Sequence, residues 1–260
     1  AALAVGFPDA SYKALPCRPT IACTADLVPP GVVELEVGYL YRRLGSGADQ
    51  QSLPFLLKLT LAEWLQLQVG SNGATFASQP APARFFDDVT VGLKLHLGDQ
   101  DARTPSLSLS ATASLPTPAA RGYVRSYDAF FIAYVTKDLG WLHADLNLGL
   151  NAWQLDTAPR AQPWAALALS TALPRGFGPM VELYYFADAA PIDPADGGLL
   201  VALSYQPRNW LVLDGGADVG LVRSTRAVSA FVGLTIIPMD AWDTGAERRA
   251  RAARQTRHER

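Results

Sequence analysis

Apolar and polar residues alternate along much of this chain with a period of two, the pattern of a β-strand that has one apolar and one polar face. The clearest segment is 142–151, in which leucine and alanine alternate with polar residues and one glycine. Segments 33–42, 89–98 and 107–115 repeat the pattern over roughly 9–11 residues, the length of a tilted strand that crosses a membrane. These segments predict strands that are apolar on one side only.

Other segments alternate over a shorter length or less regularly, and with the clear ones they predict about twelve strands. The expected strands are 33–42, 53–59, 65–69, 89–98, 107–115, 127–136, 142–151, 164–173, 179–186, 199–205, 211–219 and 228–237. Glycines within them, such as Gly38, Gly92 and Gly233, are expected at bends or at places of close packing.

The connections between the expected strands alternate between short and long. The short ones are 61–63, 99–103, 138–140, 174–177 and 206–209, whereas 44–52, 71–87, 116–126, 154–161 and 187–198 are wider. Outer-membrane barrels have short periplasmic turns and longer external loops, so this rhythm predicts an even strand number with both termini in the periplasm. Trp64, Trp141 and Trp210 each follow a short turn, where an aromatic belt would meet the periplasmic interface; ordinary strand aromatics are the alternative.

Composition excludes a membrane-spanning helix. Apolar residues make up 49% of the chain and charged residues 18%, yet no apolar run reaches the roughly 18 residues that such a helix needs. A sheet that spans a bilayer must close, because every backbone polar group needs a partner within the protein. The expected fold is therefore all-β: a closed, antiparallel, up-and-down transmembrane β-barrel. A soluble β-sandwich, with its leucine faces buried between two sheets, is the structural alternative.

In a closed barrel the polar side of each strand faces the lumen. Acids and bases both occur there, which leaves two interpretations open: charges that pair across the lumen would lock it, whereas separated charges would line a wet pore. The residues expected to line the lumen are Glu34, Glu36, Arg42, Lys58, Gln66, Gln68, Lys94, His96, Asp128, His143, Asp145, Asn147, Asn151, Glu182, Asp214 and Asp218.

Two segments fall outside the expected barrel of residues 32–237. Residues 1–31 are rich in proline and are expected to form an extended periplasmic lead-in or a partial plug. They hold both cysteines, Cys17 and Cys23, which favour a disulfide in an oxidising compartment, with free thiols as the alternative. The absence of a signal peptide before them fits a mature secreted protein. Residues 238–260 form a tail dense in arginine that we expect to be solvated, with contact to anionic lipid or a periplasmic partner as the alternative.

Several segments resemble the outer-membrane transporter family known as the MetA-pathway of phenol degradation family. The resemblance covers most of 25–237 and rests on the order and spacing of 28–31 (VPPG), 34–39 (ELEVGY), 87–94 (DDVTVGLK), 105–110 (PSLSLS), 143–149 (HADLNLG) and 209–216 (NWLVLDGG). It implies a barrel in the outer membrane of a Gram-negative bacterium with a transport role, and it carries over no catalytic residues.

The resulting expectation is a monomeric outer-membrane channel for passive passage of a small solute, hydrophobic or aromatic in class, with membrane lipid as its surroundings. A structural or adhesive barrel with a closed lumen is the alternative. An enzyme is not expected, because a nucleophilic serine needs an adjacent base, and His143 is followed two places later by Asp145 instead of Ser. Three histidines without clustered acids predict no metal site, nothing indicates a cofactor, and a net charge of −2 argues against nucleic acid.

Overall fold

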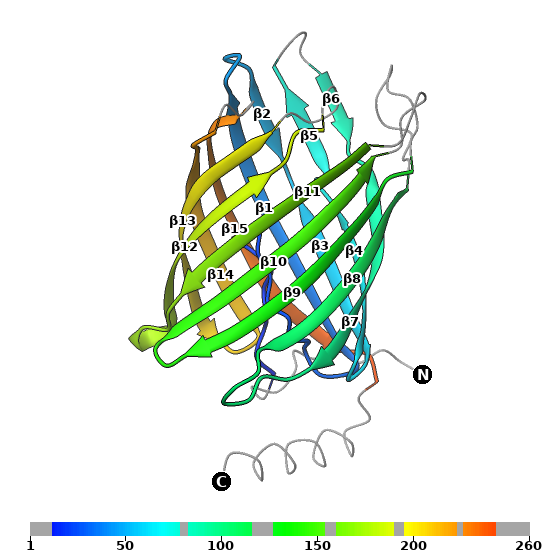
Figure 1. Ribbon diagram of the computed structural model, residues 1–260, viewed down its shortest axis with the longest axis vertical. Helices are drawn as coiled ribbons and strands as arrows, with labels where there is room; N and C mark the ends of the chain where they lie inside the picture. Colours follow the sequence, from blue (N-terminus) through cyan, green and yellow to red (C-terminus); the bar gives the residue numbers. More distant parts are fainter. Residues whose placement is uncertain are drawn as a thin grey trace.

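The computed structural model describes residues 12–78, 83–115, 127–153, 160–189, 195–222 and 226–242. They form a closed antiparallel barrel of 12 strands in up-and-down order, in which the last strand pairs with the first (Figure 1). The strands are β1 (Val32–Leu44), β3 (Phe55–Ala62), β4 (Leu65–Ser71), β7 (Val89–Gly98), β8 (Ser106–Leu115), β9 (Ala129–Leu139), β10 (Leu142–Trp153), β11 (Arg160–Ser170), β12 (Phe177–Phe186), β13 (Asp196–Arg208), β14 (Leu211–Gly220) and β15 (Arg226–Asp240). β15 thus extends a little beyond residue 237, the expected end of the barrel.

Three short strands extend the wall where the sequence indicated loops. β2 (Asp49–Ser52), β5 (Ala74–Ala77) and β6 (Ala83–Phe86) lie within the expected wide connections 44–52 and 71–87, and they pair in the order β1-β2-β5-β6. Pro54 separates β2 from β3, and Gly73 separates β4 from β5 with a φ of +66°. A Cβ at Gly73 would lie 2.2 Å from the carbonyl oxygen of Leu53, so glycine is needed at this break.

The two ends of the barrel differ in their connections. β1 begins at Val32, which pairs with Asp240 near the end of β15, so the first strand starts where the last one finishes. The tight connections between β3 and β4, β9 and β10, and β13 and β14 are also at this end, which is the lower end in Figure 1. We call it the turn end and the opposite end the loop end.

A carboxylate organises the longer turn between β7 and β8. Asp101 accepts hydrogen bonds from the backbone N–H groups of Arg103 and Thr104, both at 2.7 Å. These donors, that of Thr104 foremost, hold the pKa of Asp101 below its ordinary value. The turn is therefore closed by a local side chain, as is common for Asp in tight connections.

The strands show the alternation expected from the sequence, with polar side chains facing the interior of the barrel and apolar side chains facing outward. In β8, Ser106, Ser108 and Ser110 are buried, whereas Leu107 and Leu109 are exposed. In β10, Asn147 is fully buried and Leu148 is 50% exposed. A water-soluble protein buries its aliphatic face, so an aliphatic exterior around a polar interior identifies the surroundings of this wall as hydrocarbon. The leucines do not lie between two sheets, which excludes the β-sandwich.

The aromatic residues at the turn end do not all behave alike. Trp64 and Trp141 lie in turns and are strongly exposed, as expected for side chains at an interface. Trp210, in contrast, is partly buried and packs against the cluster that contains Tyr12, Val28 and Ile237. No helix of the described residues is long and apolar enough to span a membrane.

We expect a charge on the outer wall to destabilise the barrel according to its depth. Leu148 lies in the middle of β10 and Leu139 at the turn end of β9, and both are about half exposed. Leu148→Arg should lower the free energy of unfolding in lipid vesicles by about 2–4 kcal/mol, and Leu139→Arg by about 0–1 kcal/mol, because the cost of burying the charge falls toward the interface. Denaturant titration followed by tryptophan fluorescence measures both. Equal losses at the two positions would contradict a wall that spans a bilayer.

Candidate functional site

The interior of the barrel is occupied by the chain's own N-terminal segment. Residues 12–31 enter at the turn end and run inside the wall in extended or bent conformation, without forming a strand (Figure 1). Ala22, Ala25 and Val28 are almost completely buried there. We call residues 12–31 the plug. The start of the chain was expected to form either an extended periplasmic lead-in or a partial plug, and residues 12–31 form a plug.

A segment that forms no strand has unpaired backbone N–H and C=O groups, and these need partners when they are buried. On one side of the lumen the partners come from β1. Glu34 accepts a hydrogen bond from the N–H of Leu15 at 2.8 Å, and Glu36 accepts from Cys17 at 2.9 Å and Arg18 at 3.0 Å. Both glutamates are 0% exposed. They are positioned two residues apart, so the pleat of β1 points both to the same face.

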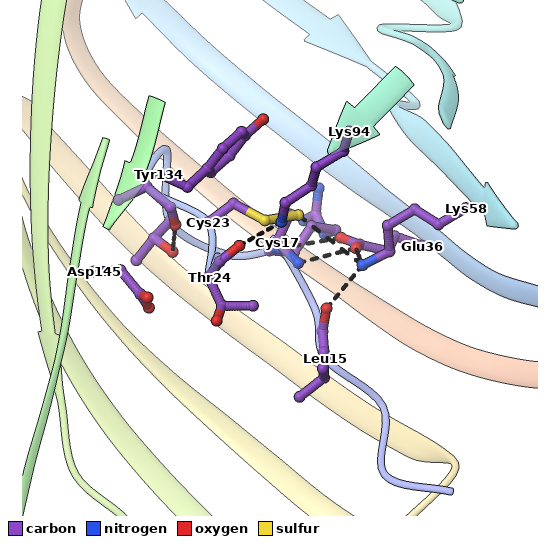
Figure 2. Close-up of a disulfide and its surroundings, with 12 residues drawn as sticks. Leu15, Cys17, Cys23, Thr24, Glu36, Lys58, Lys94, Tyr134 and Asp145 are labelled. Atoms are coloured by element: carbon purple, nitrogen blue, oxygen red, sulfur yellow. Dashed lines mark hydrogen bonds and ion pairs between the residues drawn. A yellow bond between two sulfur atoms is a disulfide. The ribbon is translucent and has the colours of Figure 1, made fainter. Parts of the chain in front are cut away.

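Lys58 of β3 completes this anchor. It lies directly opposite Glu34 in the register of β1 and β3, and its ammonium group contacts the carboxylates of both Glu34 and Glu36. The same group donates to the carbonyl of Leu15 at 2.7 Å, as Figure 2 shows. The buried charges are therefore paired with each other and with the plug backbone, which is the condition under which burial of charge is tolerated.

The middle of the plug is a loop closed by a disulfide between Cys17 and Cys23 (Figure 2). Asn147 of β10 accepts from the N–H of Cys23 at 2.7 Å and donates to its carbonyl at 2.9 Å. The amide side chain thus pairs with the backbone as a neighbouring strand would. Two strands further along the wall, Glu182 of β12 accepts from the N–H groups of Ile21 at 2.8 Å and Ala22 at 2.5 Å.

A third group of contacts holds the plug after the disulfide. Lys94 of β7 donates to the carbonyl of Thr24 at 2.5 Å, and its ammonium lies 4.3 Å from the centre of the Tyr134 ring (Figure 2). Thr136 of β9 accepts from the N–H of Ala25 at 2.7 Å. Donors and acceptors of the plug are therefore served by strands on several sides of the lumen.

Arg18 reaches the wall at a place where two strands lack side chains. Its guanidinium is 3.5 Å from the carboxylate of Asp214 and donates to the carbonyl of Val232 at 3.3 Å. Gly38 and Gly233 pair with each other across β1 and β15, and a Cβ at either one would lie 2.5 Å from the Arg18 guanidinium. These two glycines, which we expected at bends or at places of close packing, form the space for Arg18.

The residues expected to line the lumen divide by what they contact. Eight of them contact the plug: Glu34, Glu36, Lys58, Lys94, His96, Asn147, Glu182 and Asp214. Others bond within the wall, namely Gln66, Gln68, His143, Asp145, Asn151 and Asp218. Arg42 and Asp128 are only partly buried. The charges thus neither pair across an empty lumen nor stand apart in a wet pore, but hold the chain's own backbone.

Sequence reasoning missed several residues that serve the plug. Arg18 was overlooked because its segment has no periodicity. Ser108, which donates to the carbonyl of Ala25, and Thr136 lie on the polar side of their strands, but they are small and uncharged. Including every hydroxyl on the inward side of an alternating strand would have found Ser108.

A cavity of about 420 Å³ lies at the turn end, between the plug and the wall formed by β9–β14. His143 is at its rim, with Nδ1 2.6 Å from Asp138 and Nε2 3.2 Å from Asp145. Its remaining lining combines apolar residues such as Leu15, Ala168, Met180 and Val212 with polar ones such as Ser170, Ser204 and Gln206. The cavity therefore combines an apolar surface with a small group of charges, as small-molecule sites commonly do.

Known structures share this architecture. No protein-family profile matches the chain, and no curated protein matches it in sequence. The COG4313 outer membrane channel from Pseudomonas putida F1 superposes with a TM-score of 0.63 and 13% identity, covering 82% of this chain and 97% of that one. The NanC porin superposes with a TM-score of 0.53 and 9% identity, covering 78% and 98%. The fold is that of outer-membrane channels and porins, while membership of the MetA-pathway family stays a prediction.

The anchor at Glu36 gives a test of how the plug is held. Glu36→Ala removes the acceptor of two buried N–H groups, each of which costs about 1–3 kcal/mol when left without a partner. We expect faster amide hydrogen exchange at Cys17 and Arg18 in the folded protein, measured by mass spectrometry. Glu63 is an exposed glutamate in the turn between β3 and β4, so Glu63→Ala is the matched control. Unchanged protection in Glu36→Ala would show that the plug does not depend on this carboxylate.

Proposed function

We propose that this protein is an outer-membrane channel for passive passage of a small solute, and that the plug closes it in the state described. The polar interior of a barrel whose exterior is aliphatic supports this proposal, because such a wall separates a lumen from lipid. The similarity of the fold to channels and porins agrees with it. Most inward charges hold the plug or the wall, and the His143 cluster faces the cavity, which favours passage over catalysis.

The proposed orientation places the turn end, and with it both termini, in the periplasm. Outer-membrane barrels have short connections on the periplasmic side and long ones outside, and the tight turns of this barrel share an end with the start of β1 and the end of β15. In this orientation the plug enters the barrel from the periplasm, and the cavity opens toward the periplasm.

The proposed solute is small and has a hydrophobic or aromatic part. A volume of about 420 Å³ is within the usual range of small-molecule sites, roughly 300–1,000 Å³. Leu15, Met180 and Val212 offer apolar contacts in it, and the His143 cluster offers polar ones. The class of solute named by the family resemblance is consistent with this surface.

A closed barrel with a structural role is the second candidate. The observation that favours it is the number of sides on which the plug is held, by β1, β3, β7, β9, β10, β12 and β14 together. If the plug never leaves its place, the loop end of the barrel, with its extension β2–β5–β6, would carry the function.

Conductance of the full chain in planar bilayers separates the two candidates. We expect rare current steps from the unmodified protein and frequent ones from the triple variant Glu34→Gln, Glu36→Gln, Lys58→Met, because it weakens one anchor without leaving a buried charge unpaired. Glu63→Ala should behave as the unmodified protein. Silence of every protein, with barrels shown to be folded by their heat-modifiable gel migration, would overturn the channel and support the structural role.

The solute class is tested by vesicle uptake through the triple variant. The free amino acids phenylalanine and glutamine carry the same charges on their amino and carboxylate groups. Their side chains differ, since one is aromatic and the other is a polar amide. We expect phenylalanine to enter faster, because the cavity presents apolar side chains such as Met180 and the lumen beyond it holds the aromatic side chains of Trp164, Tyr184 and Phe186. Equal rates, or faster entry of glutamine, would contradict an aromatic or hydrophobic solute.

A further inference from the structure

The loop 17–23 is held differently at its two ends. Its stem, where the disulfide joins Cys17 to Cys23, is fixed to β1 through Glu36 and to β10 through Asn147. Its tip, formed by Ile21 and Ala22, meets Glu182 on β12, two strands from β10. The disulfide makes the stem a short closed unit, so the tip can move only as part of a loop of fixed length.

The position of Glu182 marks the boundary of the cavity. On β12 the cavity is lined by Phe177, Gly178 and Met180, all on the turn-end side of Glu182. On β11 its lining reaches Ala168, which pairs with Glu182 across the two strands. The cavity therefore ends at the level where the loop tip touches the wall.

Beyond that level the lumen continues as an aromatic region. Trp164, Tyr184 and Phe186 lie on the loop-end side of Glu182, and Trp164 stacks on Phe186 with ring centres 5.2 Å apart. Ala22 packs into the same cluster, together with Ile21. The loop tip thus stands between a cavity open toward the turn end and aromatic side chains that continue toward the loop end.

The contact between Glu182 and the tip suits a reversible closure. Two N–H groups from adjacent residues converge on one buried carboxylate, which is a strong arrangement while it is dry. The tip residues themselves are small or aliphatic and carry no charge. When the tip moves away, water can hydrate both the carboxylate and the two N–H groups, so neither side is left without partners.

We propose that the loop 17–23 is the gate of this channel and that Glu182 is the latch that holds it closed. The gate turns about its stem at Glu36 and Asn147, and the solute passes between the tip and the wall formed by β10–β13. This proposal rests on the proposed channel function, and it identifies the contact that holds the loop tip in the closed position.

The test compares Glu182→Ala with Thr235→Val in the full chain. Thr235 is also fully buried and faces inward on β15, and its hydroxyl has no hydrogen-bond partner within the described residues, so its replacement should be silent. Glu182→Ala should raise the fraction of time the channel is open by about tenfold or more in planar bilayers, since it removes two charge-assisted hydrogen bonds from the closed state only. Glu182→Gln, which keeps one acceptor oxygen, should be intermediate.

Hydrogen exchange in the same variant distinguishes a gate from a plug that leaves as a whole. We expect faster exchange at Ile21 and Ala22 in Glu182→Ala, with Cys17 and Arg18 still protected by Glu36. Equal acceleration at all four amides would overturn a gate that turns about its stem.

The outcomes also separate this proposal from the channel function itself. If the triple variant at Glu34, Glu36 and Lys58 conducts while Glu182→Ala does not exceed Thr235→Val, the latch is wrong and the channel stands. If no variant conducts although all are folded, the channel function fails, and the latch fails with it.

Discussion

The structure depends on hydrogen bonds between inward-facing carboxylates of the barrel and backbone N–H groups of the plug. In a closed sheet every strand already has two neighbours, so an extended segment inside it finds no free strand edge to pair with. Near its ends, Ala14 and Gly31 donate to backbone carbonyls of the wall. Between them the backbone is satisfied by side chains, and Glu34, Glu36 and Glu182 supply acceptors for the donors of residues 15–22. The dependence is mutual, because buried carboxylates are tolerated only when they are paired or hydrogen-bonded.

The same constraint explains why the wall has its polar side inward. A plug held by charges requires a polar lumen, and a polar lumen leaves the aliphatic positions for the exterior, where Leu107, Leu109 and Leu148 are exposed. An exterior of this kind is stable only in hydrocarbon, and in hydrocarbon the sheet has to close. Each strand has a polar face and an aliphatic face. This separation accounts for the closed sheet, the aliphatic belt and the anchored plug.

Strict alternation made the barrel predictable, and its absence marks where prediction failed. Segments 107–115 and 142–151 correspond closely to β8 and β10, because one wet and one lipid-facing side impose a period of two. The strands β2 and β5 were missed because Pro54 and Gly73 interrupt the pattern, and these residues ordinarily mark loops. The inward polar residues could be identified, but not their partners, since the plug has no periodicity. Nothing in the sequence indicates that Glu36 and Glu182 meet opposite parts of one disulfide-closed loop.

A plug held by side chains differs physically from one that completes the sheet. Removing a strand from a barrel exposes two edges of unpaired backbone, whereas removing this plug leaves all the pairings of β1–β15 in place. The groups released are carboxylates, lysines and amides, which water solvates well. Closed and open lumens can therefore share one unchanged wall, and the difference between them is confined to a few hydrogen bonds and the packing of small residues such as Ala22. Under the proposed channel function, the barrel changes its permeability without any change in how it is anchored in lipid.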